Sequence, residues 1–273
     1  MRSSTSAIRP NCDSDRTEAP ARRIEALSER GTLLKQLGER GLPGAFEDAL
    51  GAYEDVLSLT PREGDRFGWA GAINNLGTVY QSMGERGTAG LYQKAVACFQ
   101  DALDIFAERP HTGTWVSIQN NLGVALLRQA QFEGRDTLDE ARAAFAEALK
   151  AVSPEADGQV WAVLNNNLGS ALVQSGNKGN AEDYLDAVEA FRRCQRVMSR
   201  TAAPMAWAQS EENIAAALER YAAAKANSPD ELRQALAAAR GALEVYRQGD
   251  ATYYVDKTES LIANIEGRLT GSR

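Results

Sequence analysis

Four tryptophans, Trp69, Trp115, Trp161 and Trp207, follow one another at intervals of 46 residues, and they are all the tryptophans of the chain. A fixed spacing of this size is typical of repeat proteins, in which each structural unit contacts its neighbours along the array. Arrays of this kind present an extended concave surface that is used for binding. The spacing therefore predicts a solenoid built from tandem units.

The residues that follow each tryptophan repeat with it and predict a first helix in every unit. Offsets of seven, eight and eleven hold an aliphatic residue, a glycine and a second large apolar residue: Leu76, Leu122, Leu168 and Ile214; Gly77, Gly123, Gly169 and Ala215; Tyr80, Leu126, Leu172 and Leu218. At 100° per residue, offsets 0, 7 and 11 fall within about 40° of one another, which makes one apolar stripe on a helix. A glycine beside that stripe costs about 0.5–1 kcal/mol relative to alanine. Its recurrence predicts a neighbouring helix that passes too close for a side chain.

A second helix is predicted after the first in each unit. It carries an alanine, then an aromatic residue four positions on, then a small residue three positions further: Ala49, Ala95, Ala141 and Ala187; Tyr53, Phe99, Phe145 and Phe191; Val56, Ala102, Ala148 and Cys194. These positions form another apolar stripe at helical spacing. The fifth unit departs from the pattern, because Ala235 and Leu243 come two residues late and Ala239 replaces the aromatic residue.

The repeat divides the chain into three regions. Residues 1–20 are poor in apolar residues and are predicted to form a disordered tail. The solenoid is predicted over 21–252, in units of about 23–68, 69–114, 115–160, 161–206 and 207–252. Residues 253–270, with Val255, Ile262, Ile265 and Leu269 among charged residues, are predicted to form a helix that caps the last unit.

Composition limits the kinds of partner and the compartment. A net charge of -7 argues against a nucleic-acid partner, and no apolar run reaches the roughly 18 residues that a membrane span needs. The cysteines Cys12, Cys98 and Cys194 show no metal-ligand spacing, and the last two lie in helical apolar stretches. We therefore expect a reducing, cytoplasmic location, with no cofactor and no metal.

With W-x6-L-G-x2-[YL] on the first helix and A-x3-F-x2-A on the second, the units resemble tetratricopeptide repeats (TPR) over about 21–252. The period of 46 residues is similar to the extended arrays of bacterial signalling and protease-associated proteins, and the NNLG strings at 74–77, 120–123 and 166–169 are similar to kinesin light chain repeats. The resemblance implies an all-α fold, a right-handed α-solenoid of about five helical hairpins with a capping helix. It also implies that the first helices line the inside of a groove that binds protein segments.

An asparagine stands six residues after each tryptophan, in a row of small and polar side chains along the first helices. The predicted groove residues are Asn75, Asn121, Asn167, Asn213, Thr78, Ser117, Arg128, Ser170, Gln174, Gln209 and Arg220. An asparagine amide both donates and accepts, so it can pair with the main chain of an extended peptide. The alternative is that these asparagines bond to neighbouring helices and maintain repeat stacking. The row contains no lysine, which disfavours recognition of a C-terminal carboxylate.

Three further interpretations come from the sequence. The tryptophans are expected to be core residues between repeats, with an exposed aromatic platform as the alternative. Catalytic residues are not expected: His111 has no local partner and is expected to be solvated, and Glu211 and Glu212 are expected to face solvent. The preferred function is a protein-interaction scaffold that binds a peptide segment of a partner. The alternatives are a ligand-sensing regulator and an enzyme that uses the concavity as a small-molecule pocket; self-association through the end of the array is also compatible with the pattern.

Overall fold

The computed structural model describes residues 12–88, 90–226 and 228–271, and these residues form eleven helices. Their bounds are α1 (Cys12–Glu39), α2 (Ala45–Leu59), α3 (Arg66–Glu85), α4 (Leu91–Phe106), α5 (Gly113–Phe132), α6 (Leu138–Leu149), α7 (Gly158–Asn177), α8 (Asp183–Gln195), α9 (Pro204–Ala224), α10 (Pro229–Gln248) and α11 (Thr252–Gly271). The all-α prediction is confirmed.

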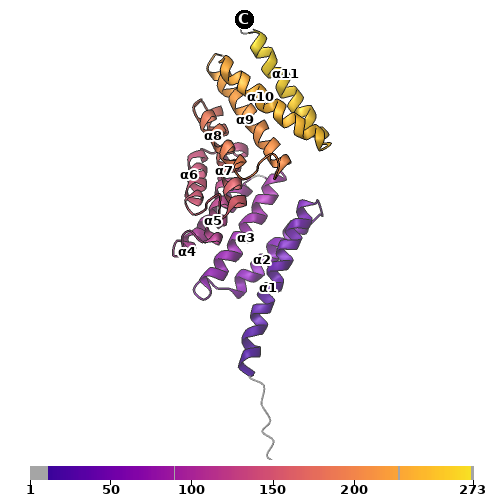
Figure 1. Ribbon diagram of the computed structural model, residues 1–273. Helices are drawn as coiled ribbons and strands as arrows, with labels where there is room; N and C mark the ends of the chain where they lie inside the picture. Colours follow the sequence, from indigo (N-terminus) through magenta and orange to yellow (C-terminus); the bar gives the residue numbers. More distant parts are fainter. Residues whose placement is uncertain (1–11, 89, 227, 272–273) are drawn as a thin grey trace, which may run out of the picture. The chain divides into compact units, whose positions relative to one another are not determined.

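The helices are grouped in two compact units, residues 1–108 and 109–273. Within the first unit, α1 packs on α2, α2 on α3, and α3 on α4. Within the second unit, α5 to α11 pack in the same sequential manner, each helix against the next (Figure 1). The first helix of one hairpin also contacts the first helix of the next hairpin, as α5 does with α7 and α7 with α9. This is the arrangement of a TPR-like solenoid, with the final helix α11 packed on α10.

The recurrent glycine and the recurrent aromatic residue lock the two helices of each hairpin together. A Cβ placed on Gly123 would stand 2.6 Å from the ring of Phe145, and one on Gly169 would stand 2.6 Å from the ring of Phe191. In the first unit, Gly77 meets Phe99 in the same way, at 2.7 Å. The close approach that the sequence predicts is therefore made by the aromatic ring of the second helix.

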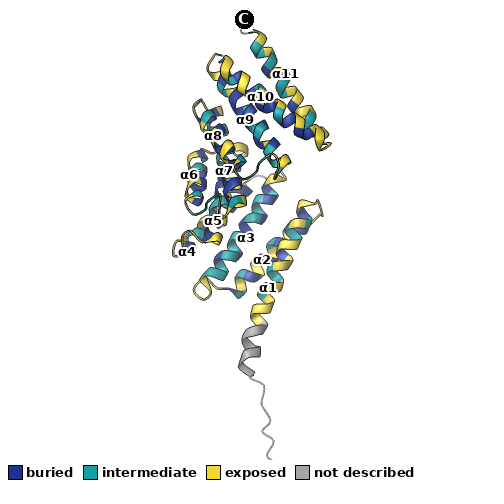
Figure 2. Cartoon of the chain, in the orientation of Figure 1, coloured by how far each residue is buried: buried dark blue, intermediate teal, exposed yellow. Residues whose placement is uncertain are grey.

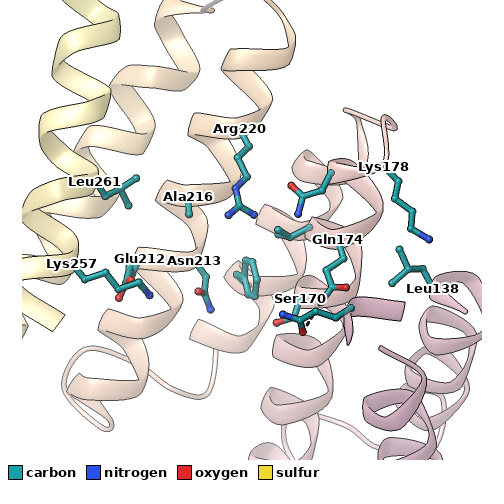
Figure 3. A pocket seen from close by; sticks show the side chains of 14 residues that line it. Leu138, Ser170, Gln174, Lys178, Glu212, Asn213, Ala216, Arg220, Lys257 and Leu261 are labelled. Carbon is teal, nitrogen blue, oxygen red and sulfur yellow. Dashed lines mark hydrogen bonds and ion pairs between the residues drawn. The ribbon is translucent and has the colours of Figure 1, made fainter. Parts of the chain in front are cut away.

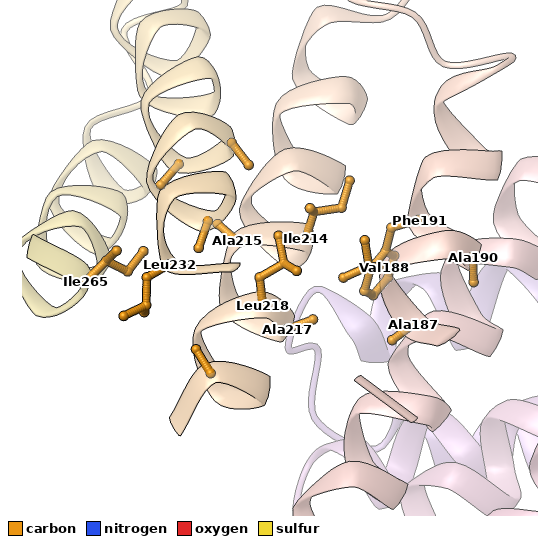
Figure 4. Packing of buried hydrophobic residues seen from close by; sticks show 14 of the residues in the cluster. Ala187, Val188, Ala190, Phe191, Ile214, Ala215, Ala217, Leu218, Leu232 and Ile265 are labelled. Atoms are coloured by element: carbon orange, nitrogen blue, oxygen red, sulfur yellow. The ribbon is translucent and has the colours of Figure 1, made fainter. Parts of the chain in front are cut away.

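The predicted apolar stripe of the second helices is buried throughout (Figure 2). The first alanine of the stripe is fully buried in α2, α4, α6 and α8, and the aromatic residue is at most 2% exposed. In the last hairpin, Ala215 and Ala239 replace the glycine and the aromatic residue, and both are buried in one cluster that extends from α7 to α11 (Figure 4). A larger residue on the first helix is thus matched by a smaller residue on the second.

Two copies of the sequence GERG form the same turn after a first helix. Gly41 and Gly87, the last residues of the two copies, have φ angles of 93° and 92°. Glycine adopts these left-handed conformations without the steric cost that a Cβ brings, and it commonly ends helices for this reason. The internal copy in the sequence therefore reflects one turn geometry used twice.

Helix α1 starts earlier than the sequence predicts. Its backbone is helical from Cys12 and continues through Pro20, whereas the sequence predicts a disordered tail over 1–20. Residues 1–11 lie outside the described residues. The prediction was based on the lack of apolar residues, which argues against burial in a core but does not prevent the backbone from being helical.

The tryptophans differ in burial although their spacing is identical. Trp115 and Trp161 are 7% and 8% exposed, which confirms the core prediction for these two. Trp69 and Trp207 are half-buried, and an arginine guanidinium covers each ring, at 4.8 Å for Arg62 and 5.3 Å for Arg200. Trp207 packs against a buried cluster that includes Ala208, Ala242 and Tyr246, and both half-buried rings also have an arginine over them.

The two cysteines that lie in predicted apolar stretches are buried, as expected. Cys98 and Cys194 are both free thiols, and burial raises the pKa of Cys98 to about 11. Across 12–88, 90–226 and 228–271, no helix has both the length and the apolar character needed to span a bilayer.

Candidate functional site

Six of the nine predicted groove residues of the second unit line two pockets that share helix α7. The first, here called the polar pocket, has a volume of about 670 Å³ and includes Ser170 and Gln174 of α7 and Asn213 and Arg220 of α9. The second, here called the valine pocket, has a volume of about 520 Å³ and includes Ser117 and Asn121 of α5. Six of the predicted residues are thus brought to concave surfaces by three successive first helices.

The polar pocket is lined by several charged side chains and amides. Lys178, Arg220 and Lys257 are its cations, and Glu212 is the carboxylate that lines it. Figure 3 shows Arg220 extending from α9 toward the side of the pocket formed by Gln174 of α7. The local charge is therefore positive, although the chain as a whole carries -7.

The cations of the polar pocket differ in what they already bind. The ammonium group of Lys178 pairs with Asp136 at 3.0 Å, and that of Lys257 pairs with Glu212 at 2.6 Å. Within the described part of the chain, Arg220 makes no hydrogen bond and no ion pair, and the same holds for the amide of Asn213. These two side chains of α9 are therefore available to a ligand.

The expectation that Glu212 faces solvent is wrong. Glu212 is 5% exposed, and both of its carboxylate oxygens have partners. Oε1 contacts Lys257 Nζ, and Oε2 accepts a hydrogen bond of 3.0 Å from the hydroxyl of Tyr246. Burial, with the adjacent carboxylate, raises the pKa of Tyr246. The partner Lys257 lies on α11, so the sequence around Glu212 gives no sign of this burial. Its neighbour Glu211 is also half-buried.

Helix α11 forms a wall of the polar pocket as well as covering the last hairpin. Lys257 and Leu261 of α11 line the pocket. Further along the same helix, Arg268 Nε lies 2.8 Å from Glu219 of α9, and the amide of Asn264 donates to the same carboxylate at 3.1 Å. From the sequence this helix was expected only to cap the last unit, so its place in the wall of a pocket was not predicted. The available signal was that Lys257 and Arg268 are spaced to lie on one face of this helix.

Amide side chains also connect neighbouring repeats. Asn167 Nδ2 on α7 donates a hydrogen bond of 2.9 Å to Asn120 Oδ1 on α5. The amide of Gln131 accepts from Arg128 at 3.0 Å and from Gln174 at 3.4 Å. Asn167 and Arg128 are thus engaged in contacts within the solenoid, whereas Asn213 is not. The bond of Asn167 to Asn120 agrees with the stacking alternative for that residue, and peptide binding by the other asparagines stays a prediction.

The valine pocket is lined by both apolar and amide side chains. Val160 and Val163 lie one turn apart on α7, and they are 45% and 48% exposed. Both line the pocket together with Met198, Asn120 and Asn121. A surface of this composition is suited to a ligand group that is apolar but flanked by hydrogen-bonding atoms. Val160 and Met198 were not among the predicted site residues.

The remaining predicted residues lie elsewhere. In the first unit, Asn75 and Thr78 are half-buried on α3, where Thr78 donates to the Asn75 carbonyl at 2.7 Å and Asn75 Oδ1 accepts from Asn74 at 3.4 Å. In the second unit, Gln209 is exposed and lines neither pocket.

The structure also shows the surroundings of His111 and of the side chains that could hold a metal ion. His111 packs edge-on against Trp115, with ring centroids 5.3 Å apart. In the described segments, no group of three or more His, Cys, Asp and Glu side chains is arranged to hold a metal ion.

Comparison with known proteins supports the fold. No protein-family model matches the chain, and no curated protein matches it in sequence. Among solved structures, a crystal structure of MamA protein is similar with a TM-score of 0.54 at 16% identity, covering 85% of this chain and 96% of that one. A second MamA crystal structure has a TM-score of 0.52 at 19% identity, covering 76% and 92%. The crystal structure of YrrB, described as a TPR protein with an unusual peptide-binding site, has a TM-score of 0.52 at 20% identity, covering 88% and 98%. At these identities the likeness shows a TPR-like fold.

Proposed function

We propose that the protein is an interaction scaffold whose second unit binds an extended segment of a partner protein across α5, α7 and α9. The observation that carries this proposal is the pair of pockets on α7, lined by amide side chains from three successive first helices. Amides that donate and accept can satisfy the main chain of a bound segment. The TPR-like fold is typically used for protein interaction, and YrrB, a protein of similar fold, is described as having a peptide-binding site.

A binding role is favoured over a catalytic one by the state of the pocket carboxylate. Glu212 is the carboxylate that lines the polar pocket, and Lys257 and Tyr246 occupy both of its oxygens. A general base needs a lone pair directed at the substrate proton. Glu212 instead holds α9 to α10 and α11, so we assign it a structural role.

The test separates the asparagines that bind from those that hold repeats together. Peptides are selected from a random displayed library on the intact chain, and the affinity of one selected peptide is measured by fluorescence anisotropy. Asn213→Ala should weaken binding about 2-fold to 10-fold, the effect of one hydrogen bond of 0.5–1.5 kcal/mol, with the melting temperature unchanged. Asn167→Ala should lower the melting temperature, because its amide bonds to Asn120.

Asn180→Ala is the matched control, because Asn180 lies in the exposed turn between α7 and α8. It should change neither affinity nor melting temperature. An Asn213→Ala variant with full affinity for every selected peptide, or a library that yields no groove-dependent peptide, would contradict the proposal.

A further inference from the structure

The two pockets differ in chemistry, and both are built on the same row of helix α7. Val163 lines the valine pocket, and Ser170 and Gln174 line the polar pocket, so the row runs from one pocket into the other. Asn167, whose amide crosses to Asn120, lies between them on this row. A segment that follows α7 would therefore meet an apolar surface first and a positively charged one second.

The polar pocket is positively charged and can accept an added negative charge. The acidic residues near it already have partners: Asp136 pairs with Lys178, Glu212 with Lys257 and Tyr246, and Glu219 with Arg268 and Asn264. Arg220 is exposed and makes no hydrogen bond and no ion pair with the described residues, although its charge acts on the nearby Tyr184 hydroxyl, and it points from α9 toward α7 (Figure 3). A guanidinium group can bind a carboxylate through two parallel hydrogen bonds. Asn213, equally without a partner, adds a hydrogen-bond donor in the same pocket.

The dimensions of α7 give the distance between two of its residues that line the two pockets. Val163 and Gln174 are separated by eleven positions, which corresponds to about 16 Å along the axis at 1.5 Å per residue. An extended chain advances about 3.3 Å per residue, so it covers this distance in about five or six residues.

We infer that the second unit recognises an extended protein segment carrying an apolar side chain and, about five or six positions away, a carboxylate side chain, with the apolar group in the valine pocket and the carboxylate on Arg220. This inference rests on the proposed function and specifies its partner. Carboxylate recognition here depends on Arg220, not on lysines of the predicted row.

The experiment is a selection from a random dodecapeptide library whose C-terminus is fused to the display protein, so that side chains supply the carboxylates. The intact wild-type chain should enrich peptides with an apolar and an acidic residue at this spacing. Arg220→Glu should weaken a selected acidic peptide about 10-fold or more and shift the selection to lysine or arginine at the acidic position. Val163→Ser should remove the apolar preference and leave the acidic one.

Two controls match these variants. Arg233→Glu reverses a charge on α10, where Arg233 pairs with the exposed Asp230, and should not change the selection. Leu42→Ser alters an exposed apolar residue of the first unit and should also have no effect. Synthetic peptides with a free or an amidated C-terminus distinguish a side-chain carboxylate from a terminal one: equal affinity supports the inference, and binding that requires the free terminus overturns it.

The outcomes separate this inference from the proposed function. If the wild-type chain enriches no peptides, the proposed function fails and the inference fails with it. If peptides are enriched and depend on Asn213 but show no acidic preference, or if Arg220→Glu selects the same sequences as wild type, the inference alone is overturned.

Discussion

Helices α7 and α9 occupy equivalent places in consecutive repeats but use different chemistry at equivalent positions. Four, five and twelve residues after the tryptophan, α7 has Asn165, Asn166 and Val173, whereas α9 has Glu211, Glu212 and Glu219. On its side toward the preceding repeat, α7 contacts α5 through the amide pair of Asn167 and Asn120. On its side toward the end of the chain, α9 contacts α11 through ion pairs with Lys257 and Arg268.

The core packing of these two repeats differs in a compensating way. Gly169 of α7 lies under the ring of Phe191, whereas Ala215 of α9 and Ala239 of α10 are both buried without an aromatic ring at that position. In the last repeat, a larger residue on the first helix is thus accompanied by a smaller residue on the second helix. The last repeat has three glutamates where the inner repeat has two asparagines and a valine, and two of these glutamates pair with basic residues of α11.

The largest expected effect is the loss of stability on removing the aromatic ring that packs against the glycine of the first helix. Phe191→Ala should lower the free energy of unfolding by about 3–5 kcal/mol, because it removes a buried ring and leaves a cavity above Gly169. Ala239→Phe, which places the ring of the inner repeat into the last one, should cost about 1–3 kcal/mol through overpacking against Ala215. Urea denaturation followed by circular dichroism measures both values.

Phe132→Ala is the matched control for the aromatic substitutions, since Phe132 is 63% exposed. It should change stability by no more than about 0.5 kcal/mol. A Phe191→Ala variant as stable as this control would show that the ring does not set the separation of α7 and α8.

An intermediate effect is expected at the contact of α9 with α11. The double variant Glu212→Asn and Glu219→Val gives α9 residue types that an inner repeat uses, and it removes the ion pairs to Lys257 and Arg268. We expect the free energy of local opening of α11 to fall by about 1–3 kcal/mol. Hydrogen exchange should show faster exchange of α11 amides while the amides of α5 and α7 keep their protection.

Salt gives an independent measure of the same contact. In the wild type, high salt should speed exchange in α11, because both basic partners are partly exposed and their ion pairs are screened. The double variant should have lost most of this salt response, and Glu189→Gln, which removes an exposed pair with Arg193, should retain it. Unchanged exchange of α11 in the double variant would mean that apolar packing alone holds this helix.

The smallest effect concerns pH and Glu211. Burial raises the pKa of this carboxyl in the folded protein, although hydrogen bonding from Gln195 and the charge of Arg192 act in the opposite direction. A raised folded pKa means that the folded state holds the proton more tightly. The contribution of Glu211 to the free energy of unfolding is therefore fully present below its unfolded pKa, near 4.5. It is lost as the pH rises through the pKa of the folded state.

Glu211→Gln tests this pH dependence while keeping a hydrogen-bonding group opposite Gln195. The urea midpoint of the variant should decline less than that of the wild type as the pH rises above 4.5. Glu259→Gln, at an exposed ion pair with Arg247, serves as the control and should follow the wild type. Parallel curves for Glu211→Gln and the wild type would argue against a raised pKa.

The amino-acid sequence by itself determined the helices, their pairing into hairpins and the close contact at each glycine. A 46-residue spacing of Trp, Gly and Phe positions specifies which faces are apolar and where a side chain is too large, and these are local and repeated constraints. The sequence also placed Asn213 and Arg220 in a polar row, and the structure brings both to one pocket.

Only the tertiary structure decided which polar residues are free to bind. Arg128 and Arg220 look equivalent in the repeat, yet Arg128 donates a hydrogen bond to Gln131, whereas Arg220 makes no hydrogen bond and no ion pair with the described residues. Glu212 looks exposed, yet Lys257, 45 positions later, pairs with it. The physical reason is that partners across repeats depend on the rotation and separation of packed helices, which the period of a sequence does not encode.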